Sequence, residues 1–410
     1  MDDRSREAEL EPGAPWAPDG IAPFSLEEAM SLLGEASVAA AGLAGVAAIR
    51  DGSLAPLVEL SASTRRWREI ALGVSLQGLG PRLAALPHDE RLPAELRGHL
   101  DGEAERGAAR GERVLGLLAR LAALLAGEGL RAVPLKGAAL VLGGETPAGL
   151  RPMADLDLLF DSEVDLRRAA GRIEAELGWR PLWDTDRHLV LAERDERVAL
   201  PGCEHPDNPL RIELHRAFRL RVLGRTLDAT DALRRRTRRS GGWELPSEEA
   251  LLLHLLLHAA EDFAAKGLRG VQCVDFLLLS RRRGPLPLEG LPARAVPPVV
   301  LAARAVEGLF PGTFVPEELA RASTTVAPRV LVRAATIPPL RHSRAARGWT
   351  RTALGLVEGA PAAIRHLLRT LFPPLDEVRA NVAPGATGPA LAAAWLRVLS
   401  GRIGSAIRGR

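Results

Sequence analysis

The chain has 410 residues, of which 47% are hydrophobic and 26% charged, a balance typical of a folded protein with more than one structural unit. Its 54 basic and 51 acidic side chains nearly cancel, so the net charge of +3 does not indicate a nucleic-acid-binding protein. No apolar run reaches the length of a membrane span, the N-terminus has no signal-peptide pattern, and Cys203 and Cys273 form no CxxC pair. We therefore expect a cytoplasmic protein without a disulfide framework.

The first part of the chain is predicted to be disordered and then helical. Residues 1–24 are charged and rich in Pro, Ala and Gly, which is typical of a disordered segment. Ser25 and Glu28 form a capping box, so we expect a helical N-terminal region over residues 25–130, broken at prolines. The longest helix is expected over 103–126, where leucines recur at helical spacing and a glycine follows the run.

A change of pattern near residue 131 predicts a small mixed sheet. Short apolar runs of strand character alternate with a short helix and an amphipathic helix, an order that indicates a mixed sheet backed by helices. We assign this core to residues 131–245. Its strands are expected at 131–135, 153–160, 210–215 and, more weakly, 188–192.

From residue 246 the pattern is helical again. Ser247 opens a leucine-rich helix that continues to His258, and helical segments separated by prolines follow. The C-terminal helical region is therefore assigned to residues 246–410. The expected fold class is α+β and predominantly helical, with a small mixed β-sheet core flanked by N- and C-terminal helical regions.

The strongest candidate site is a pair of carboxylates in the strand expected at 153–160. Alternate side chains of a strand share one face, so Asp155 and Asp157 project together while Leu156 and Leu158 face the other way. Two carboxylates on one face of an apolar strand repel each other, and oxygen ligands at this density suit Mg²⁺ or Mn²⁺. The sequence therefore predicts a metal site here.

The strand expected at 210–215 supplies a third carboxylate. There Arg211, Glu213 and His215 share one face, opposite three apolar side chains. A carboxylate on a neighbouring strand is what two-metal nucleotidyl transfer requires, one ion holding a triphosphate and the other activating a hydroxyl. We expect His215 near the chemistry, beside the metal ligands rather than among them, as one of the residues that bind the nucleotide cofactor. The alternative is a half-exposed edge strand with mixed charges.

Three further residues are candidates for phosphate binding. A strand that ends in Lys136-Gly137 and opens a helix offers free backbone N–H groups to an anion, although the Walker A pattern is absent. Gly137 allows close approach of the backbone, and the Lys136 ammonium could reach a β- or γ-phosphate. Arg151 precedes the strand expected at 153–160 and either binds a phosphate or forms a loop salt bridge.

These segments together resemble the bacterial "uncharacterised nucleotidyltransferase" family of the polymerase-β-like nucleotidyltransferase superfamily. The resemblance runs from about residue 25 to the C-terminus and is densest over 133–275. It is carried by Leu135-Lys136-Gly137, Arg151-Pro152-Met153-Ala154-Asp155-Leu156-Asp157-Leu158-Leu159 and Ile212-Glu213-Leu214-His215. Weaker similarity is found in His254 to His258 with Asp275, and in 371–379.

The resemblance implies an enzyme that transfers a nucleoside monophosphate from a nucleoside triphosphate such as ATP to a hydroxyl of a small molecule or protein, with Mg²⁺ or Mn²⁺. Asp155 and Asp157 would then be the metal-binding pair, and Glu213 the third carboxylate or general base. The Gly-Ser turn usual in the superfamily is replaced by Lys136-Gly137, so the phosphate contact must differ.

Two other functions remain open at this point. An inactive nucleotide- or protein-binding scaffold of the same fold would direct Glu213 away from the aspartate pair. An RNA-modifying transferase would need its arginines to line the groove of the carboxylates. We interpret the arginine clusters as solvated loops or helix ends, because no aromatic residues that could stack on bases lie between them. The clusters are Arg234, Arg235, Arg236, Arg238 and Arg239, and Arg281, Arg282 and Arg283.

His254 and His258 stand one helical turn apart, a spacing that can bind zinc. The HExxH pattern is absent and leucines surround both residues, so packing or pocket lining is the preferred interpretation. Asp275 lies downstream and could pair with either histidine; a structural role is expected for it.

Overall fold

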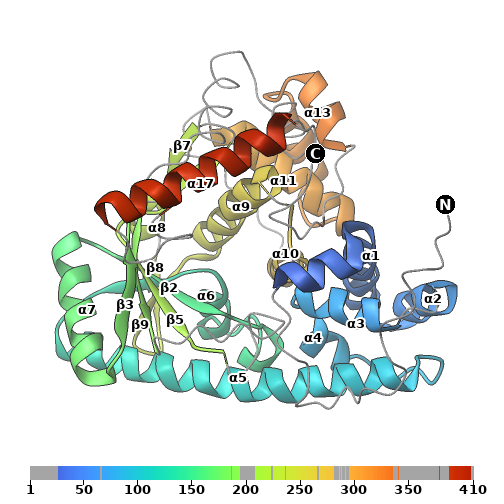
Figure 1. The fold of residues 1–410 in the computed structure, drawn as a ribbon, viewed down its shortest axis with the longest axis horizontal. Helices are drawn as coiled ribbons and strands as arrows, with labels where there is room; N and C mark the ends of the chain where they lie inside the picture. Colours follow the sequence, from blue (N-terminus) through green and yellow to red (C-terminus); the bar gives the residue numbers. More distant parts are fainter. Residues whose placement is uncertain are drawn as a thin grey trace.

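The structure, a computed structural model, describes most of the chain (Figure 1). The described residues are 26–64, 67–185, 187–193, 208–222, 225–235, 237–265, 267–280, 286, 288, 291, 295–335, 340, 378 and 387–407. The segment expected to be disordered, Cys203, Arg236, the second arginine cluster and the 371–374 part of the family resemblance lie outside them. Within the described residues no helix is both long and apolar enough to span a membrane.

Helices form the N-terminal region, as predicted. They are α1 (Leu26–Asp51), α2 (Ala55–Thr64), α3 (Trp67–Leu76), α4 (Gly80–Ala84) and α5 (Ala94–Gly127). Helix α5 begins after Pro93, earlier than the expected start at residue 103. Its first turns carry charged and small residues without a continuous apolar stripe, so periodicity could not reveal them. Figure 1 shows α5 running beneath the sheet at one end and beneath α3 and α4 at the other.

The predicted mixed sheet is confirmed. It has five strands in the order β1-β2-β5-β4-β3, and only the central β2–β5 pair is parallel. The strands are β1 (Ala132–Pro134), β2 (Asp155–Phe160), β3 (Arg180–Asp184), β4 (His188–Ala192) and β5 (Arg211–His215). Strand β3 was not expected from the sequence, because it is largely exposed and contains Pro181. An edge strand tolerates both features.

One face of the sheet is covered by α5 and by α7 (Glu163–Leu177). The leucine face of α5, from Val114 to Leu125, shares one apolar core with Leu156, Leu158 and Ile212 of the central strands. Strand alternation then turns the polar side chains of β2 and β5 to the opposite face. There lies α6 (Lys136–Leu142), which follows β1 and contacts β2. The single turn η2 (Ala148–Leu150) comes before β2 and packs against α5.

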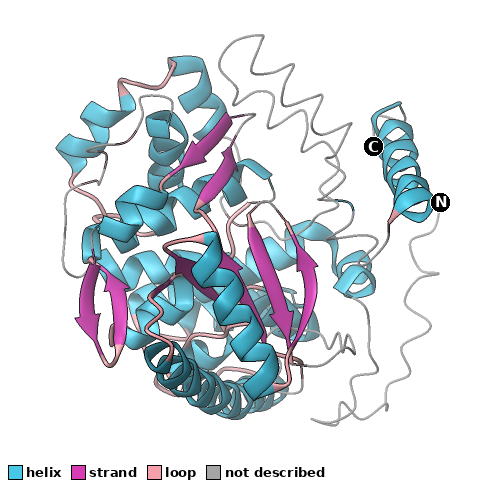
Figure 2. Cartoon of the chain, turned by 90° about the vertical axis from the view of Figure 1, so that its left-hand side faces the viewer, coloured by secondary structure: helices cyan, strands magenta, loops and turns pink. Residues whose placement is uncertain are grey.

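Two hairpins and a short helix follow the sheet. They are β6 (Arg219–Val222) with β7 (Arg225–Asp228), α8 (Thr230–Arg235), and β8 (Thr237–Ser240) with β9 (Trp243–Pro246). Figure 2 shows the hairpins as separate pairs of strands beside the sheet. Neither was expected from the sequence, since the strands are short and rich in arginine. The available signal was Gly241-Gly242, which adopts the positive φ values that a two-residue hairpin turn needs.

The described part of the C-terminal region is mostly helical, as predicted. Its described helices are α9 (Glu248–Ala265), α10 (Gly270–Ser280), α11 (Val296–Leu309), α12 (Pro316–Ser323), α13 (Pro328–Ala335) and α17 (Gly388–Ile407). Helices α9 to α12 share one apolar core with the N-terminal helices α1 to α4, and Val133 and Leu159 of the sheet also join it. The N- and C-terminal helical regions therefore form a common body against which the sheet packs.

Candidate metal centre

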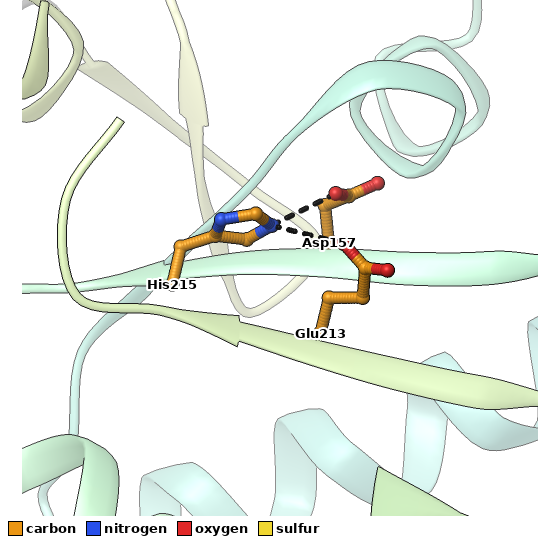
Figure 3. A group of neighbouring side chains, drawn as sticks. All are labelled: Asp157, Glu213 and His215. Atoms are coloured by element: carbon orange, nitrogen blue, oxygen red, sulfur yellow. Dashed lines mark hydrogen bonds and ion pairs between the residues drawn. The ribbon is translucent and has the colours of Figure 1, made fainter. Parts of the chain in front are cut away.

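The register of the parallel strands sets the position of the carboxylates. In the β2–β5 pair Asp157 lies opposite Glu213, while Asp155 lies opposite Arg211. The apolar neighbours of both carboxylates are buried in the core beneath the sheet. Asp157, Glu213 and His215 consequently occupy the same, upper face, and Figure 3 shows their side chains pointing toward one another.

The three side chains form a compact group of possible metal ligands. His215 Nε2 lies 2.8 Å from Asp157 Oδ1 and 3.6 Å from Glu213 Oε2. One donor atom from each residue lies within 4.8 Å of the other two. Asp155, expected to pair with Asp157, is not one of the three. His215, expected beside the ligands, has its Nε2 among them.

Lys136 contacts the same carboxylate. Its Nζ lies 2.8 Å from Asp157 Oδ1, the oxygen that also faces His215. The Lys136 backbone has φ 48°, the only positive φ among the described non-glycine residues. A lysine in the left-handed region is strained, and such strain persists where surrounding structure enforces it, often at functional sites. The start of α6 is thus shaped to hold the Lys136 ammonium at the carboxylates.

The charges of these groups stabilise one another. Burial alone would raise the pKa of Asp157, but Lys136 and His215 hold it well below its ordinary value. Burial likewise opposes charge on Glu213, yet the neighbouring His215 leaves its pKa lowered. Burial would lower the pKa values of His215 and Lys136, whereas the carboxylates raise both. The group is therefore two ionised carboxylates neutralised by neighbouring cations.

Arg151 and Gly137, both predicted to bind phosphate, have structural contacts. The Arg151 guanidinium donates to both Asp275 oxygens, at 3.0 and 2.9 Å, and to the Pro152 carbonyl. A Cβ at Gly137 would lie 2.7 Å from Met153 Sδ, so a larger residue there would force the Met153 side chain to move. The salt bridge offered as the alternative role of Arg151 is present, and it joins the segment before β2 to α10.

A buried arginine that the sequence reading overlooked fixes the starts of both central strands. Arg110 of α5 is 2% exposed. Its guanidinium donates to the carbonyls of Met153 and Ala154 before β2 and to that of Asn208 before β5. Its sequence signal is its place on the buried face of α5, one turn before Val114. A charged residue at such a position needs buried partners.

Two other histidines lie near the centre. The His188 and His215 ring centroids are 5.3 Å apart, and burial lowers the pKa of His188 to about 4. His254 is fully buried in α9 against Phe218, and neither of its ring nitrogens has a hydrogen-bond partner among the described residues. The sequence singled out His254 but not His188, a strand residue whose neighbours across the sheet only the register reveals.

The remaining candidates form contacts outside the centre. Nδ1 of His258 lies 3.0 Å from the Gln272 amide nitrogen, which also donates to Asp262. Within the first arginine cluster, Arg234 donates to the Phe160 and Arg216 carbonyls, and Arg239 lies 3.9 Å from Glu244. These contacts give Arg234 a structural role, whereas the side chains of Arg235 and Arg239 are largely exposed.

The fold and the centre define a mixed α+β protein with a carboxylate group suited to a divalent cation. A family model described as "Uncharacterised nucleotidyltransferase" matches residues 67–297, more than half of the chain. The chain belongs to this family, and the predicted resemblance is confirmed over that range. No curated protein matches the chain. No solved structure matches it either.

Proposed function

We propose that this protein is a divalent-metal-dependent nucleotidyltransferase that moves a nucleoside monophosphate group from a nucleoside triphosphate to a hydroxyl of a small molecule or protein. The observation that carries the proposal is the parallel pairing that sets Asp157 beside Glu213, in a chain of a nucleotidyltransferase family. Family membership alone supports a transferase of nucleotidyl groups; the pairing supports dependence on a metal ion.

The donor set fits a divalent cation. Asp157 and Glu213 would hold it. That Asp155, on the same face of β2, binds a second ion or the triphosphate stays a prediction. A bound cation would supply positive charge that reduces repulsion at the α-phosphate and aligns the attacking hydroxyl. Lys136 is the cationic side chain best placed for a phosphate, because its Nζ already lies at Asp157. Arg151 and Gly137 support the site through their packing, and a direct phosphate contact for either stays a prediction.

The chemical step is an in-line displacement. The hydroxyl oxygen of the acceptor forms a bond to the α-phosphorus, the bond from that phosphorus to the bridging oxygen breaks, and pyrophosphate leaves. The hydroxyl proton goes to a carboxylate, and Glu213, ionised and partly exposed, is the candidate base. Positioning and charge stabilisation account for most of the expected rate gain.

The scaffold alternative is less well supported. It requires a Glu213 side chain directed away from the aspartates, whereas Glu213 Oε2 lies within the same group of donor atoms as Asp157. The RNA-modifying alternative requires arginines that line the carboxylate groove. Arg234 is instead engaged by backbone carbonyls, so this arginine does not favour the RNA-modifying alternative.

The experiment that tests the proposal is calorimetric titration of ATP, GTP, CTP and UTP with Mg²⁺ or Mn²⁺ into the full chain. We expect metal-dependent binding of one nucleotide, lost in Asp157→Asn. Asp51→Asn is the matched control, because Asp51 is an exposed carboxylate at the end of α1. The nucleotide that binds then serves as donor in an acceptor screen that follows pyrophosphate release.

If well-folded protein binds none of the four nucleotides, the result would contradict the proposed transferase and favour the inactive scaffold of the same fold. Binding that Asp157→Asn leaves intact would place the nucleotide elsewhere and remove the carboxylate centre from the proposal.

A further inference from the structure

The shared face of the central strands offers a nitrogen donor where a third oxygen would be expected. Along β2, Asp157 is followed on the same face by Leu159, which has no donor atom. Opposite Leu159 on β5 lies His215. The donors at this corner of the sheet are therefore two carboxylates, from Asp157 and Glu213, and one imidazole.

The spacing of these donors fits ligation of one ion. Ligands held at about 2.1 Å from a metal and separated by right or tetrahedral angles lie about 3.0 to 3.4 Å from each other. The observed separations of His215 Nε2 from the two carboxylate oxygens are 2.8 and 3.6 Å, on either side of that interval. Small rotations of the side chains would bring all three donors onto one cation.

The chemistry of the donors discriminates between ions. Mg²⁺ binds oxygen ligands and keeps several waters, whereas imidazole suits first-row transition ions. Mn²⁺ shares the carboxylate preference of Mg²⁺, and as a first-row transition ion it binds an added imidazole more readily than Mg²⁺ does. We propose that His215 is itself a metal ligand and that the centre consequently selects Mn²⁺ over Mg²⁺. This inference rests on the cation site of the proposed function and adds a third ligand and the identity of the ion.

The test uses Mn²⁺ alone, titrated into the full chain and followed by electron paramagnetic resonance. Pulsed spectra of the bound ion report directly whether an imidazole nitrogen is coordinated. We expect nitrogen coupling in the wild type and in His188→Gln, and its loss in His215→Gln. The affinity of His215→Gln for Mn²⁺ should be lower than that of the wild type by about tenfold or more. His188 is the matched control, because its ring lies 5.3 Å from that of His215 and is outside the donor group. Competition with Mg²⁺ should displace Mn²⁺ from the wild type only at a large excess.

The possible outcomes distinguish a failure of the proposed role of His215 from a failure of the proposed function. If the wild type binds no Mn²⁺, or if Asp157→Asn binds it equally well, the cation site of the proposed function fails. If Mn²⁺ binds and requires Asp157 but shows no nitrogen coupling, only the role of His215 is overturned. Coupling that survives in His215→Gln and disappears in His188→Gln would assign the ligand to His188 instead. The wild-type spectrum decides the main point even if a variant fails to fold.

Discussion

Asp157 and Asp275, two of the buried carboxylates among the described residues, have partners that differ in kind. Asp157 and Asp275 each have side chains 2% exposed and each contacts a basic residue. The Arg151 guanidinium forms a bidentate salt bridge with both carboxylate oxygens of Asp275. Lys136 and His215 instead approach a single oxygen of Asp157 as separate point donors.

The difference indicates two purposes for buried charge. A planar guanidinium is preorganised for a carboxylate and is rarely exchanged, so the Arg151–Asp275 pair suits a permanent joint between the sheet and α10. A lysine ammonium is a compact charge on a flexible stem and can leave when another cation arrives. Lys136 is 23% exposed and has solvent to turn toward. We therefore expect that a metal ion can replace the Lys136 ammonium at Asp157.

The largest expected effect on stability comes from removing the Arg151–Asp275 ion pair. Asp275→Ala leaves the Arg151 guanidinium buried without its carboxylate, and removing one partner of such a pair costs about 3 to 5 kcal/mol of folding free energy. Asp157→Ala should cost less than half as much, because Lys136 can turn to solvent. Urea unfolding of both variants measures the comparison. Equal losses would contradict the distinction between the two carboxylates.

The packing that connects the two regions should give the next effect. A Cβ at Gly137 would lie 2.7 Å from Met153 Sδ and 3.1 Å from an Arg151 nitrogen. We expect Gly137→Ala to lower the free energy of unfolding by about 1 to 3 kcal/mol through overpacking. In a Met153→Ala background the loss caused by Gly137→Ala should be smaller, as a double-mutant cycle would show.

Gly116→Ala is the control for this substitution. A Cβ at Gly116 meets nothing within 4 Å, so alanine should stabilise α5 by about 0.5 to 1 kcal/mol. If both glycine variants shifted stability alike, the contact with Met153 would not explain the result.

The Lys136–Asp157 pair predicts that a mutation raises the affinity for Mn²⁺. Lys136→Met removes a cation that competes for Asp157, so the affinity for Mn²⁺ alone should rise about tenfold, equivalent to about 1.4 kcal/mol. Nucleotide binding should weaken in the same variant, since a phosphate loses its nearest cation. Arg91→Met, at a 69% exposed cation, is the control. Lower Mn²⁺ affinity in Lys136→Met would contradict displacement.

The smallest effect concerns a histidine outside both pairs. Burial lowers the pKa of His99, whose neighbours are Glu103, Arg106, Ser75 and the Ala71 backbone. The unfolded chain then binds the proton more readily, so this contribution to stability is complete above about pH 6.5 and is lost as the pH falls below it. The slope is at most about 1.4 kcal/mol per pH unit. Unfolding curves against pH should be flatter in His99→Gln; an unchanged slope would show that His99 does not titrate on unfolding.

The sequence predicted the parts of the site that depend on periodicity. Strand alternation placed Asp157 and Glu213 on polar faces, and the order of elements predicted a mixed sheet. The parallel register that joins Asp157 to Glu213 rather than to Arg211 was not deducible, because it depends on tertiary contacts such as those of Arg110. The choice between phosphate and salt bridge for Arg151 likewise required the position of Asp275, more than a hundred residues away in the chain.

The parallel pairing of β2 with β5 also has a consequence for how the protein reaches its native state. Asp157 and Glu213 lie 56 positions apart, and Arg110 joins Asn208 across a sequence separation of 98 residues. Such contacts form only after long loops have closed, and chains dominated by them fold slowly. During synthesis the ribosome must release β5 before the proposed metal centre can form, so a nascent chain shortened before residue 211 lacks the Asp157–Glu213 pair. Metal uptake is therefore expected as a late event in folding.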